Sequence, residues 1–300
     1  MINQEFYHTA VLLAEAVDGL DIKENGVYVD ATFGGGGHSG EILKRLGPHG
    51  VLIAFDQDED AWRNKPDDDR LIPVAENNKY LSRFLRLHGH SEVDGVLADL
   101  GVSSFQFDQA ERGFSLRFDG PLDMRMDKRS ELTAGHVIRT YTEAQLHKLL
   151  EQYGEVRNAK QLAKHITEQR KGMKVTTIAG LKAMIEPVIR GNPNRYLAQL
   201  FQALRIEVND ELGALKELLL EAGKSLKPGG RLSVISFHSL EDRIVKQYMK
   251  KGNWDGDDEM TERAKPILKP INAKPIEPTE KEIRSNPRAR SAKLRIGEKL

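Results

Sequence analysis

The stretch that decides the fold is GVYVDATFGGGGHSG, residues 26–40. Its first six residues form an apolar run rich in β-branched and aromatic side chains, which predicts a buried strand. A run of glycines follows, and residues 39–46 then have the spacing of a helix. A strand that enters a helix through a glycine-rich turn is typical of α/β sheets, in which the helix returns the chain to the next parallel strand.

The same alternation continues along the first hundred residues. Further strands are expected at 51–56, 71–75 and 93–99, with a polar helix start at 58–63 and a helix at 80–87 between them. Because strands that alternate with helices form βαβ crossovers, this region predicts a mostly parallel, Rossmann-like sheet. We therefore assign the chain to the α/β class.

The glycine loop also suggests a ligand, since it contains the pattern G-x-G-x-x-G at Gly35, Gly37 and Gly40. Glycines there let a ligand approach the backbone, and the N–H groups at the helix N-terminus can bind it. The second strand ends in Asp56, whose carboxylate can accept both hydroxyls of a ribose. The combination predicts a nucleoside-bearing cofactor, against the alternative of a purely structural turn. Nicotinamide dinucleotides would place a pyrophosphate at the helix N-terminus, and S-adenosylmethionine its amino-acid carboxylate.

The end of the fourth strand favours S-adenosylmethionine. This strand ends in Asp99, and a tight polar turn with Ser103 and Ser104 follows. The turn falls at the sheet edge where open α/β proteins bind ligands, and methyltransferases that act on exocyclic amines place polar residues there. The alternative is an aspartate that only caps a turn.

The α/β alternation stops near Gly101 and resumes after Asn209. An irregular stretch at 105–127 precedes segments with helical spacing. These segments are 142–153, 159–170, 177–189 and 195–208, and the first begins with the capping pair Thr142 and Gln145. We expect a helical insertion at 110–208 and one α/β core formed by residues 1–109 and 209–300.

The residues after the insertion are expected to complete the sheet. A helix at 210–225 leads to a turn at 227–230 and an apolar strand at 231–237. From 252 to 287, five prolines among scattered lysines predict a surface excursion that lacks regular structure. Residues 291–296 alternate as an edge strand would.

Composition excludes several classes of protein. The 300 residues are 39% hydrophobic and 30% charged, which suits a soluble globular chain of one or two domains. No stretch approaches the roughly 20 apolar residues that span a bilayer, and residues 1–5 show no signal-peptide pattern, so we expect a cytoplasmic protein without membrane partners. With no cysteine there is no disulfide, thiol nucleophile or cysteine-ligated zinc.

The net charge of zero hides an asymmetry along the chain. Residues 1–100 carry 18 acidic and 9 basic side chains, whereas 112–205 carry 17 basic and 9 acidic and 265–300 carry 10 basic and 4 acidic. Segments with such a basic excess can bind a polyanion such as nucleic acid, although they can equally be solvated helix faces.

Further strings of residues carry a family resemblance. They are His8-Thr9-Ala10-Val11-Leu12-Leu13, Glu111-Arg112-Gly113-Phe114-Ser115, Gly120-Pro121-Leu122-Asp123-Met124-Arg125-Met126-Asp127, Phe201-Gln202-Ala203-Leu204-Arg205-Ile206, Ser236-Phe237-His238-Ser239-Leu240-Glu241-Asp242-Arg243 and Asn286-Pro287-Arg288-Ala289-Arg290-Ser291. With the glycine loop and the Asp99 turn, these blocks cover nearly the whole chain. The sequence resembles the bacterial MraW or RsmH methyltransferases, which methylate the N4 amine of a cytidine in 16S ribosomal RNA of the small ribosomal subunit.

The resemblance implies a class I S-adenosylmethionine-dependent methyltransferase core with an inserted helical domain that faces RNA. It also implies the residues that contact the cofactor, which are Gly36, Gly37, His38, Asp56, Asn78, Asp99 and Gln106. Two positions depart from the family pattern. Asn78 stands where an aromatic residue is common and cannot stack on adenine, and Phe105 stands where proline is usual.

The candidate catalytic residues follow from the reaction. A cytosine amine is a poor nucleophile, and acceptors that bind its protons would make its lone pair available. We hypothesise that Asp99, Ser103 and Ser104 line this point, although Asp99 can instead be committed to the cofactor. His38 could act as a base, but the family places it at the cofactor. His238 follows a strand at the same sheet edge and is a further candidate, unless neighbouring Glu241 simply holds it.

The RNA-binding candidates are more general. The target base must leave its stack to enter a protein pocket, and the phenylalanines at 105, 107, 114 and 118 could receive it or could form core. Candidate phosphate contacts are Arg125, Arg129, Arg288, Arg290 and Lys293. We expect no metal, and interpret the 123–127 string as a shaped loop. The rival functions are a nicotinamide-dependent dehydrogenase and a non-catalytic RNA-binding protein with a methyltransferase fold.

Overall fold

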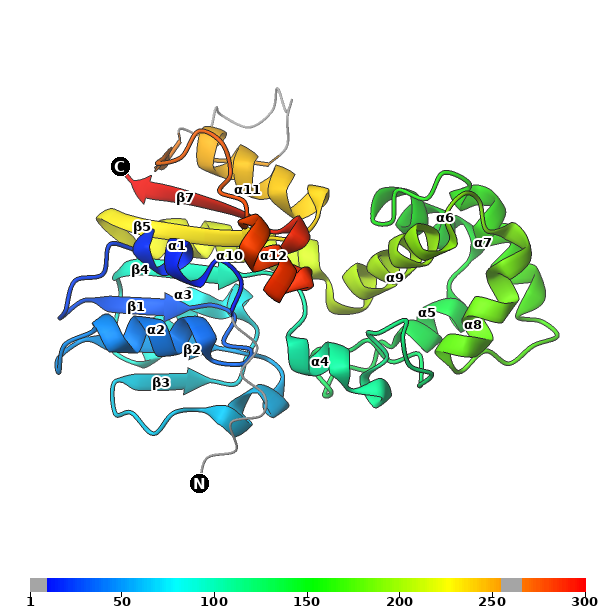
Figure 1. Ribbon diagram of the computed structural model, residues 1–300, viewed down its shortest axis with the longest axis horizontal. Helices are drawn as coiled ribbons and strands as arrows, with labels where there is room; N and C mark the ends of the chain where they lie inside the picture. Colours follow the sequence, from blue (N-terminus) through cyan, green and yellow to red (C-terminus); the bar gives the residue numbers. More distant parts are fainter. Residues whose placement is uncertain (1–9, 255–265) are drawn as a thin grey trace. The chain divides into compact units, whose positions relative to one another are not determined.

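The computed structural model describes residues 10–254 and 266–300 and divides them into two compact units (Figure 1). Unit 1 contains the described residues up to Gly101 and from Leu212 onward, and unit 2 contains Val102–Glu211. The sequence placed these boundaries at 109/110 and 208/209. Phe107 packs against the core of unit 2, so the segment that follows Gly101 belongs there. No helix of the described residues is both long and apolar enough to cross a membrane.

Unit 1 is built on a sheet in which seven strands are described, in the order β3-β2-β1-β4-β5-β7-β6 (Figure 1). Its strands are β1 Val27–Asp30, β2 Val51–Phe55, β3 Leu71–Val74, β4 Val93–Asp99, β5 Leu226–Ser236, β6 Leu268–Pro270 and β7 Lys293–Lys299. β1 to β5 run parallel to one another, whereas β7 runs antiparallel to both β5 and β6. The predicted class, a mostly parallel Rossmann-like α/β sheet, is confirmed.

Helices cover both faces of this sheet, which explains why its strands are apolar without alternation. Tyr28 and Leu52 pack with α1 and α2 in one core cluster, while Val29 and Ile53 pack with α3, α10 and α11 in another. The helical elements of unit 1 are α1 Leu13–Asp18, α2 Gly37–Arg45, α3 Leu81–Leu87, α10 Glu211–Ser225, α11 Ser239–Lys251 and α12 Glu280–Ser285, with 3-10 turns η1 Glu59–Asn64, η2 Asn78–Tyr80 and η5 Pro287–Ser291. The first residue of α10 lies in unit 2.

Three expectations for the C-terminal part were wrong. Residues 293–299 form β7, which is not an edge strand but lies between β5 and β6. The turn at 227–230 is a bulge inside β5, where the pairing with β4 shifts between Val93 and Gly95. The excursion from 252 to 287 contains β6 and α12, because its prolines fall at the ends of these elements or outside them; residues 255–265 of it lie outside the described residues.

Unit 2 is helical around its own apolar core. Its elements are α4 Ser104–Asp108, η3 Ala110–Arg112, α5 Ala134–Thr140, α6 Glu143–Gln152, α7 Ala159–Gln169, α8 Ile178–Ile185, η4 Glu186–Val188 and α9 Pro193–Asn209. The predicted capping box is present at α6, where Thr142 Oγ1 accepts the Gln145 N–H. The sequence missed α4 in the stretch expected to be irregular and α5 just after it.

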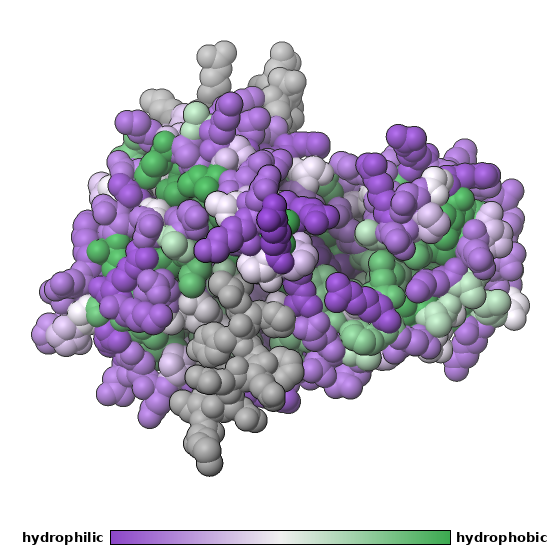
Figure 2. All heavy atoms as spheres, in the orientation of Figure 1, coloured by the Kyte–Doolittle hydropathy of each residue, from purple (hydrophilic) through white to green (hydrophobic). Residues whose placement is uncertain are grey.

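Hydrophilic side chains make up most of the surface in the view of Figure 2.

Candidate cofactor-binding and active site

Three aspartates lie at the carboxyl edge of the sheet in unit 1. Asp30 ends β1 and is in register with Ala54 of β2 and Leu97 of β4. Asp56 and Asp99 are each two residues beyond these partners, so all three carboxylates meet at one edge. Ligands of open α/β sheets bind at this edge, beyond the carboxyl ends of the strands.

The glycine loop joins this edge to α2, and its glycines have different reasons to be there. Gly36 is the N-cap of α2 with φ +78°, and a Cβ on it would lie 2.9 Å from the Phe33 ring. A Cβ on Gly37 would lie 2.8 Å from the Cβ of Ala10. A Cβ on Gly35 would meet no described atom within 4 Å. The fold therefore needs Gly36 and Gly37, while Gly35 leaves the backbone open to an approaching ligand.

Asp56 is held beside the glycine loop by backbone donors. Its carboxylate accepts the N–H of Gly34 at 2.8 Å and the N–H of Asp58 at 2.9 Å. Burial raises the pKa of Asp56 to about 7, and the neighbouring Asp58 and Asp30 add to the rise, while the two hydrogen bonds oppose it. Each carboxylate oxygen keeps a further lone pair, so hydroxyl donors of a ribose fit this group and would stabilise its charged form.

Asp99 faces His38 across the same edge. His38 is buried, and its Nε2–H donates to the Val11 carbonyl oxygen at 3.1 Å, which leaves Nδ1 at 3.7 Å from Asp99 Oδ2. The other oxygen, Oδ1, is buried and has no hydrogen-bond partner in the part of the chain that the structure describes. Burial raises the pKa of Asp99 to about 6, against the influence of His38 and with that of Asp30 and Glu241. A buried acceptor without a donor fits a ligand that brings one.

Asp30 and Thr32 support this arrangement, and sequence reasoning missed both. Asp30 is fully buried and accepts the Ser39 hydroxyl at 2.6 Å and the Thr32 N–H at 3.0 Å. Thr32 Oγ1 in turn accepts the Asp99 N–H at 2.6 Å. Burial is the main cause that raises the pKa of Asp30. An acid at the end of an otherwise apolar strand was the available signal for Asp30.

Trp62 is a second residue that the sequence did not single out. Its indole stacks on Phe33 at 4.7 Å between ring centroids and donates its Nε1–H to the Asp56 carbonyl oxygen at 3.3 Å. The Trp62–Phe33 pair thus joins η1 to the glycine loop beside the carboxylate of Asp56. Trp62 lies far from the glycine loop along the chain, so no local sequence pattern could have indicated this contact.

Asn78 lies at the start of η2, after β3, and its side-chain NH₂ donates to the Ala31 carbonyl oxygen at 2.9 Å. The amide therefore ties η2 to the end of β1. The resemblance led us to expect an aromatic residue here, and the structure gives the asparagine a bridging contact that a phenyl ring could not make. The side chain stays half-buried.

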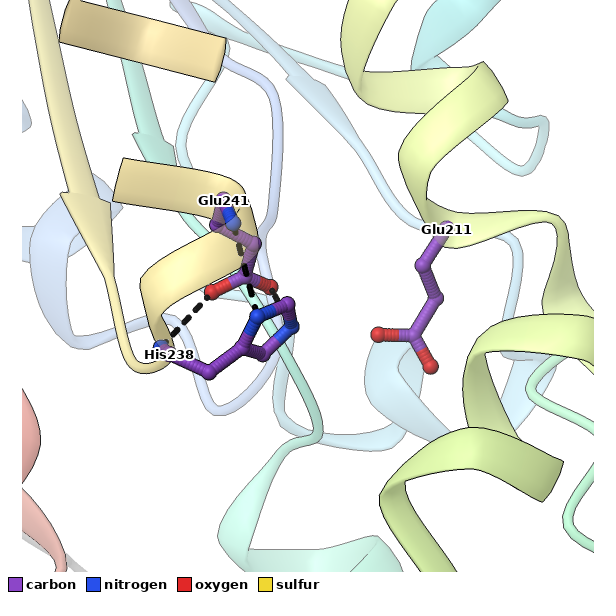
Figure 3. Close-up of side chains that lie close together, drawn as sticks. All are labelled: Glu211, His238 and Glu241. Atoms are coloured by element: carbon purple, nitrogen blue, oxygen red, sulfur yellow. Dashed lines mark hydrogen bonds and ion pairs between the residues drawn. The ribbon is translucent and has the colours of Figure 1, made fainter. Parts of the chain in front are cut away.

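His238 is the N-cap of α11 (Figure 3). Its Nδ1 accepts the Glu241 N–H at 3.4 Å and its Nε2 lies 3.1 Å from Glu241 Oε1, while the Glu241 carboxylate accepts the Phe237 N–H at 2.8 Å. Nδ1 thus caps the helix, as in the structural alternative considered for this residue, whereas the buried Nε2 lies near Glu241 but has no hydrogen-bond partner among the described residues. Glu211, drawn in the same figure, belongs to unit 2, where its carboxylate pairs with Arg205 at 2.7 Å.

The polar turn residues after Asp99 belong to unit 2 and open its first helix. Ser103 is the N-cap of α4 and forms a capping box with Gln106: Ser103 Oγ accepts the Gln106 N–H at 3.2 Å, and Gln106 Oε1 accepts the Ser103 N–H at 3.1 Å. Ser104 is the first residue of the helix, and Phe105 next to it is 38% exposed. Ser103 and Gln106 therefore have a structural role in α4 whatever ligand they contact.

The remaining phenylalanines of this region divide between core and surface. Phe114 is buried in the core of unit 2, and Phe107 packs against it. Phe118 is 44% exposed, as a residue that receives a base would have to be.

The two arginines of the 123–129 region are paired with aspartates inside unit 2. Arg125 binds Asp123 with Nη2 to Oδ2 at 2.7 Å, and its Nη1 donates to the carbonyl oxygens of Lys128 and Ser130. Arg129 binds Asp127 at 2.9 Å. These contacts lower the pKa of both aspartates, although burial opposes this. The loop neutralises its own charges and is pinned by Asn209, whose Nδ2–H₂ donates to the Met124 carbonyl oxygen at 2.8 Å.

The other basic candidates lie near the start of β7 in unit 1. Arg290 is exposed in η5, whereas Arg288 and Lys293 are half-buried. The backbone of Lys293 pairs with Ser236 of β5. Of the strings that carried the family resemblance, His8 and Thr9 lie outside the described residues.

The strand order of unit 1, with one antiparallel strand between β5 and β6 and a polar edge beside a glycine loop, defines a class I methyltransferase fold. The MraW methylase family matches residues 5–300, and the chain belongs to this family.

Similar proteins match over almost their whole length. The chain is 54% identical over 297 residues to "Ribosomal RNA small subunit methyltransferase H" of Christiangramia forsetii, which covers 98% of each chain. Proteins of the same name from Bacteroides fragilis and Flavobacterium johnsoniae are 53% and 52% identical and cover 98% of this chain and 97% and 98% of their own.

Proposed function

We propose that this protein transfers a methyl group from S-adenosylmethionine to the N4 amine of a cytidine in 16S ribosomal RNA of the small ribosomal subunit. The observation that carries the proposal is the 54% identity, over 98% of both chains, to a relative named as a small-subunit ribosomal RNA methyltransferase. The choice of N4 of cytidine rests on the resemblance described from the sequence. The edge of unit 1 supports a methyl transfer, because it offers polar acceptors where α/β proteins bind ligands.

The residues of the edge fit the proposed cofactor. S-adenosylmethionine, when bound, supplies an electrophilic methyl group on a sulfonium sulfur. The backbone of Gly36 and Gly37 at the N-terminus of α2 would bind its carboxylate, and Asp56 would accept its ribose hydroxyls. His38, Asn78, Asp99 and Gln106 are the other proposed contacts.

Asp99 is the proposed acceptor for the target amine. Its unpartnered Oδ1 can accept a hydrogen bond from an N–H, which leaves the nitrogen lone pair more available for attack. As the N–CH₃ bond forms, the amine must lose one proton, and a carboxylate with a pKa of about 6 is a better base near neutral pH than an ordinary aspartate. Ser103 and Ser104 are the proposed further acceptors, and His238 is proposed as a cap of α11 rather than a base.

The experiment that tests the proposal is transfer of labelled methyl from S-adenosylmethionine to small ribosomal subunits from a strain that lacks this protein, followed by nucleoside analysis. N4-methylated cytidine is the expected product. Label in another nucleoside would overturn the choice of target, and no transfer to subunits or free RNA, despite binding of the cofactor, would leave the non-catalytic RNA-binding rival. Binding of NADH but not S-adenosylmethionine would reverse the cofactor assignment.

A further inference from the structure

An open pocket of about 380 Å³ lies wholly within unit 2, where the loop after α7 passes the C-terminal end of α5. Its lining includes four basic residues, Arg139, Arg170, Lys171 and Lys174, and the exposed side chain of Met173, while Ile138 and Val175 are buried beneath them. The volume falls within the roughly 300–1,000 Å³ of ligand pockets. The pocket shares no residue with the edge of unit 1 described above.

The four cations have different tasks. Arg170 donates from Nη1 to the carbonyl oxygens of Ile138 and Tyr141, at 2.8 and 2.7 Å, and so caps the end of α5 and shapes the pocket wall. Arg139, Lys171 and Lys174 are exposed, and none of the three forms an ion pair with a residue that the structure describes. No acidic side chain lines the pocket within the described ranges. Three unneutralised charges therefore face the same opening.

The loop that carries two of these charges is anchored at both ends. The N–H of Met173 donates to the carbonyl oxygen of Gln169 at the end of α7, at 3.1 Å. After the pocket, Val175 is 2% exposed in the core, and the Thr176 carbonyl oxygen accepts the Leu122 N–H at 3.0 Å. A loop that is already ordered loses less conformational freedom when it binds, so the pocket is prepared for a ligand.

We propose that this pocket binds one nucleotide of a single-stranded segment of the RNA substrate. Arg139, Lys171 and Lys174 would contact the phosphodiester oxygens on either side of the nucleotide, and the exposed side chain of Met173 would contact its base. The proposal rests on the proposed function, since it names how the insertion holds that substrate. It also moves the phosphate-binding role within unit 2 away from Arg125 and Arg129, whose charges are already matched by aspartates.

The test compares two triple variants with the same change in charge. R139E/K171E/K174E alters the pocket, and K148E/R157E/K160E is the matched control, because these three residues are exposed in unit 2 and form no ion pair with the described part of the chain. The probe is a 20-nucleotide single-stranded RNA of mixed sequence, titrated at several salt concentrations in parallel with S-adenosylmethionine binding and methyl transfer to small subunits. Circular dichroism checks that both variants remain folded.

The slope of log affinity against log salt should fall by about 2 in the pocket variant, the counterion release of three contacts on single strands, which corresponds to RNA binding about 100-fold weaker at about 0.1 M salt. The control should lose at most about threefold, because exposed charges are screened beyond about 10 Å. Cofactor affinity should not change in either.

Equal losses of RNA affinity in the two variants would overturn the pocket proposal. The proposal would also fail if the pocket variant bound intact subunits more weakly but bound the RNA normally, and that result would indicate an acidic protein partner. These outcomes are separable from failure of the proposed function. If the wild-type protein methylates subunits while the pocket variant binds RNA normally, only the pocket proposal fails. If the wild-type protein transfers no methyl at all, the proposed function fails whatever the RNA titration gives.

Discussion

The aspartates at the carboxyl edge of the sheet in unit 1 and those of the 123–127 loop in unit 2 have opposite surroundings. At the edge of unit 1, burial raises the pKa of Asp30, Asp56 and Asp99, and none of the three forms an ion pair with an arginine or lysine among the described residues. In unit 2, Asp123 and Asp127 lie beside arginines that lower their pKa. An unpaired buried carboxylate costs stability, whereas a paired one orders a loop. The difference separates acids that are kept for a ligand from acids that are kept for the fold.

The largest effect should follow from a change at Asp99, the proposed acceptor for the target amine. Asp99→Asn keeps the shape of the side chain but cannot take a proton, and we expect methyl transfer to small subunits to fall by about 100-fold or more. Single-turnover assays with saturating S-adenosylmethionine would measure this. The matched control is Asp127→Asn in unit 2, which should keep transfer within about twofold. Comparable rates for Asp99→Asn and the wild type would show that the unpaired acid has no part in the chemistry.

A smaller loss is expected at Asp56, the proposed acceptor of the ribose hydroxyls, together with a change in how stability depends on pH. Asp56→Asn should weaken S-adenosylmethionine binding by about tenfold, measured by calorimetry. In the wild type without cofactor, the raised pKa of Asp56 stabilises the folded state at pH values below 3.8, the pKa of this group in the unfolded chain. This contribution to stability is lost as the pH rises through about 7. The variant lacks this loss.

The difference in Tm between Asp56→Asn and the wild type should therefore move in favour of the variant as pH rises from about 4 to about 7, and then stay constant. At this chain length about 2–4 °C corresponds to each kcal/mol. Thermal scans of both proteins across this range give the result. A difference in Tm that does not vary with pH would mean that burial of the charged Asp56 carboxylate does not destabilise the folded state. Asp56 would then not differ from the paired aspartates of unit 2.

For a paired side chain in unit 2, stability should change and RNA binding should not. Arg125→Ala removes the contacts to Asp123 and to two carbonyl oxygens, and we expect the free energy of unfolding to fall by about 1–2 kcal/mol. The salt slope of RNA binding should remain that of the wild type. Urea unfolding and RNA titration measure the two quantities, and a slope that falls by about 1 would restore Arg125 as a phosphate contact.

The smallest effect is expected at His238, whose Nδ1 already serves as the N-cap of α11. Asn is a good N-cap, so His238→Asn should change the free energy of unfolding by at most about 0.5 kcal/mol, whereas His238→Ala should cost about 1 kcal/mol. Methyl transfer by the folded variants should stay near the wild-type rate. If both variants are stable but transfer drops by about tenfold or more, His238 acts in catalysis and not only as a cap.

Sequence reasoning succeeded where the determinants are local. The strand, glycine loop and helix of residues 26–46 follow one another along the chain, and each has its own composition. Asp56 and Asp99 were identifiable because they directly follow or end apolar strands, and the carboxyl ends of parallel strands share an edge. The short helix α5 was missed because seven residues give too little periodicity to separate a helix from a turn.

What could not be predicted depends on contacts between distant segments. The position of β7 inside the sheet is decided by its pairing with β5 and β6, and a period-2 pattern does not reveal how many neighbours a strand has. The pairing of Arg125 and Arg129 with aspartates two residues earlier depends on the backbone of a loop, which composition does not give. The basic pocket brings Arg139 together with Lys171 and Lys174 from two separate helix ends.

The placement of β7 has a consequence for the order in which this chain can fold during synthesis. Unit 2 is one continuous segment, so all of its core residues have been made, and can pack together, before the C-terminal part of unit 1 is synthesised. Unit 1 is split, and the side of β5 that β7 will occupy stays unpaired until residues 293–299 have been made. During that interval an apolar strand has an open hydrogen-bonding edge, which is a template for wrong pairing with other chains. A nascent chain of this protein therefore has most to gain from a chaperone after β5 is made and before β7 is released.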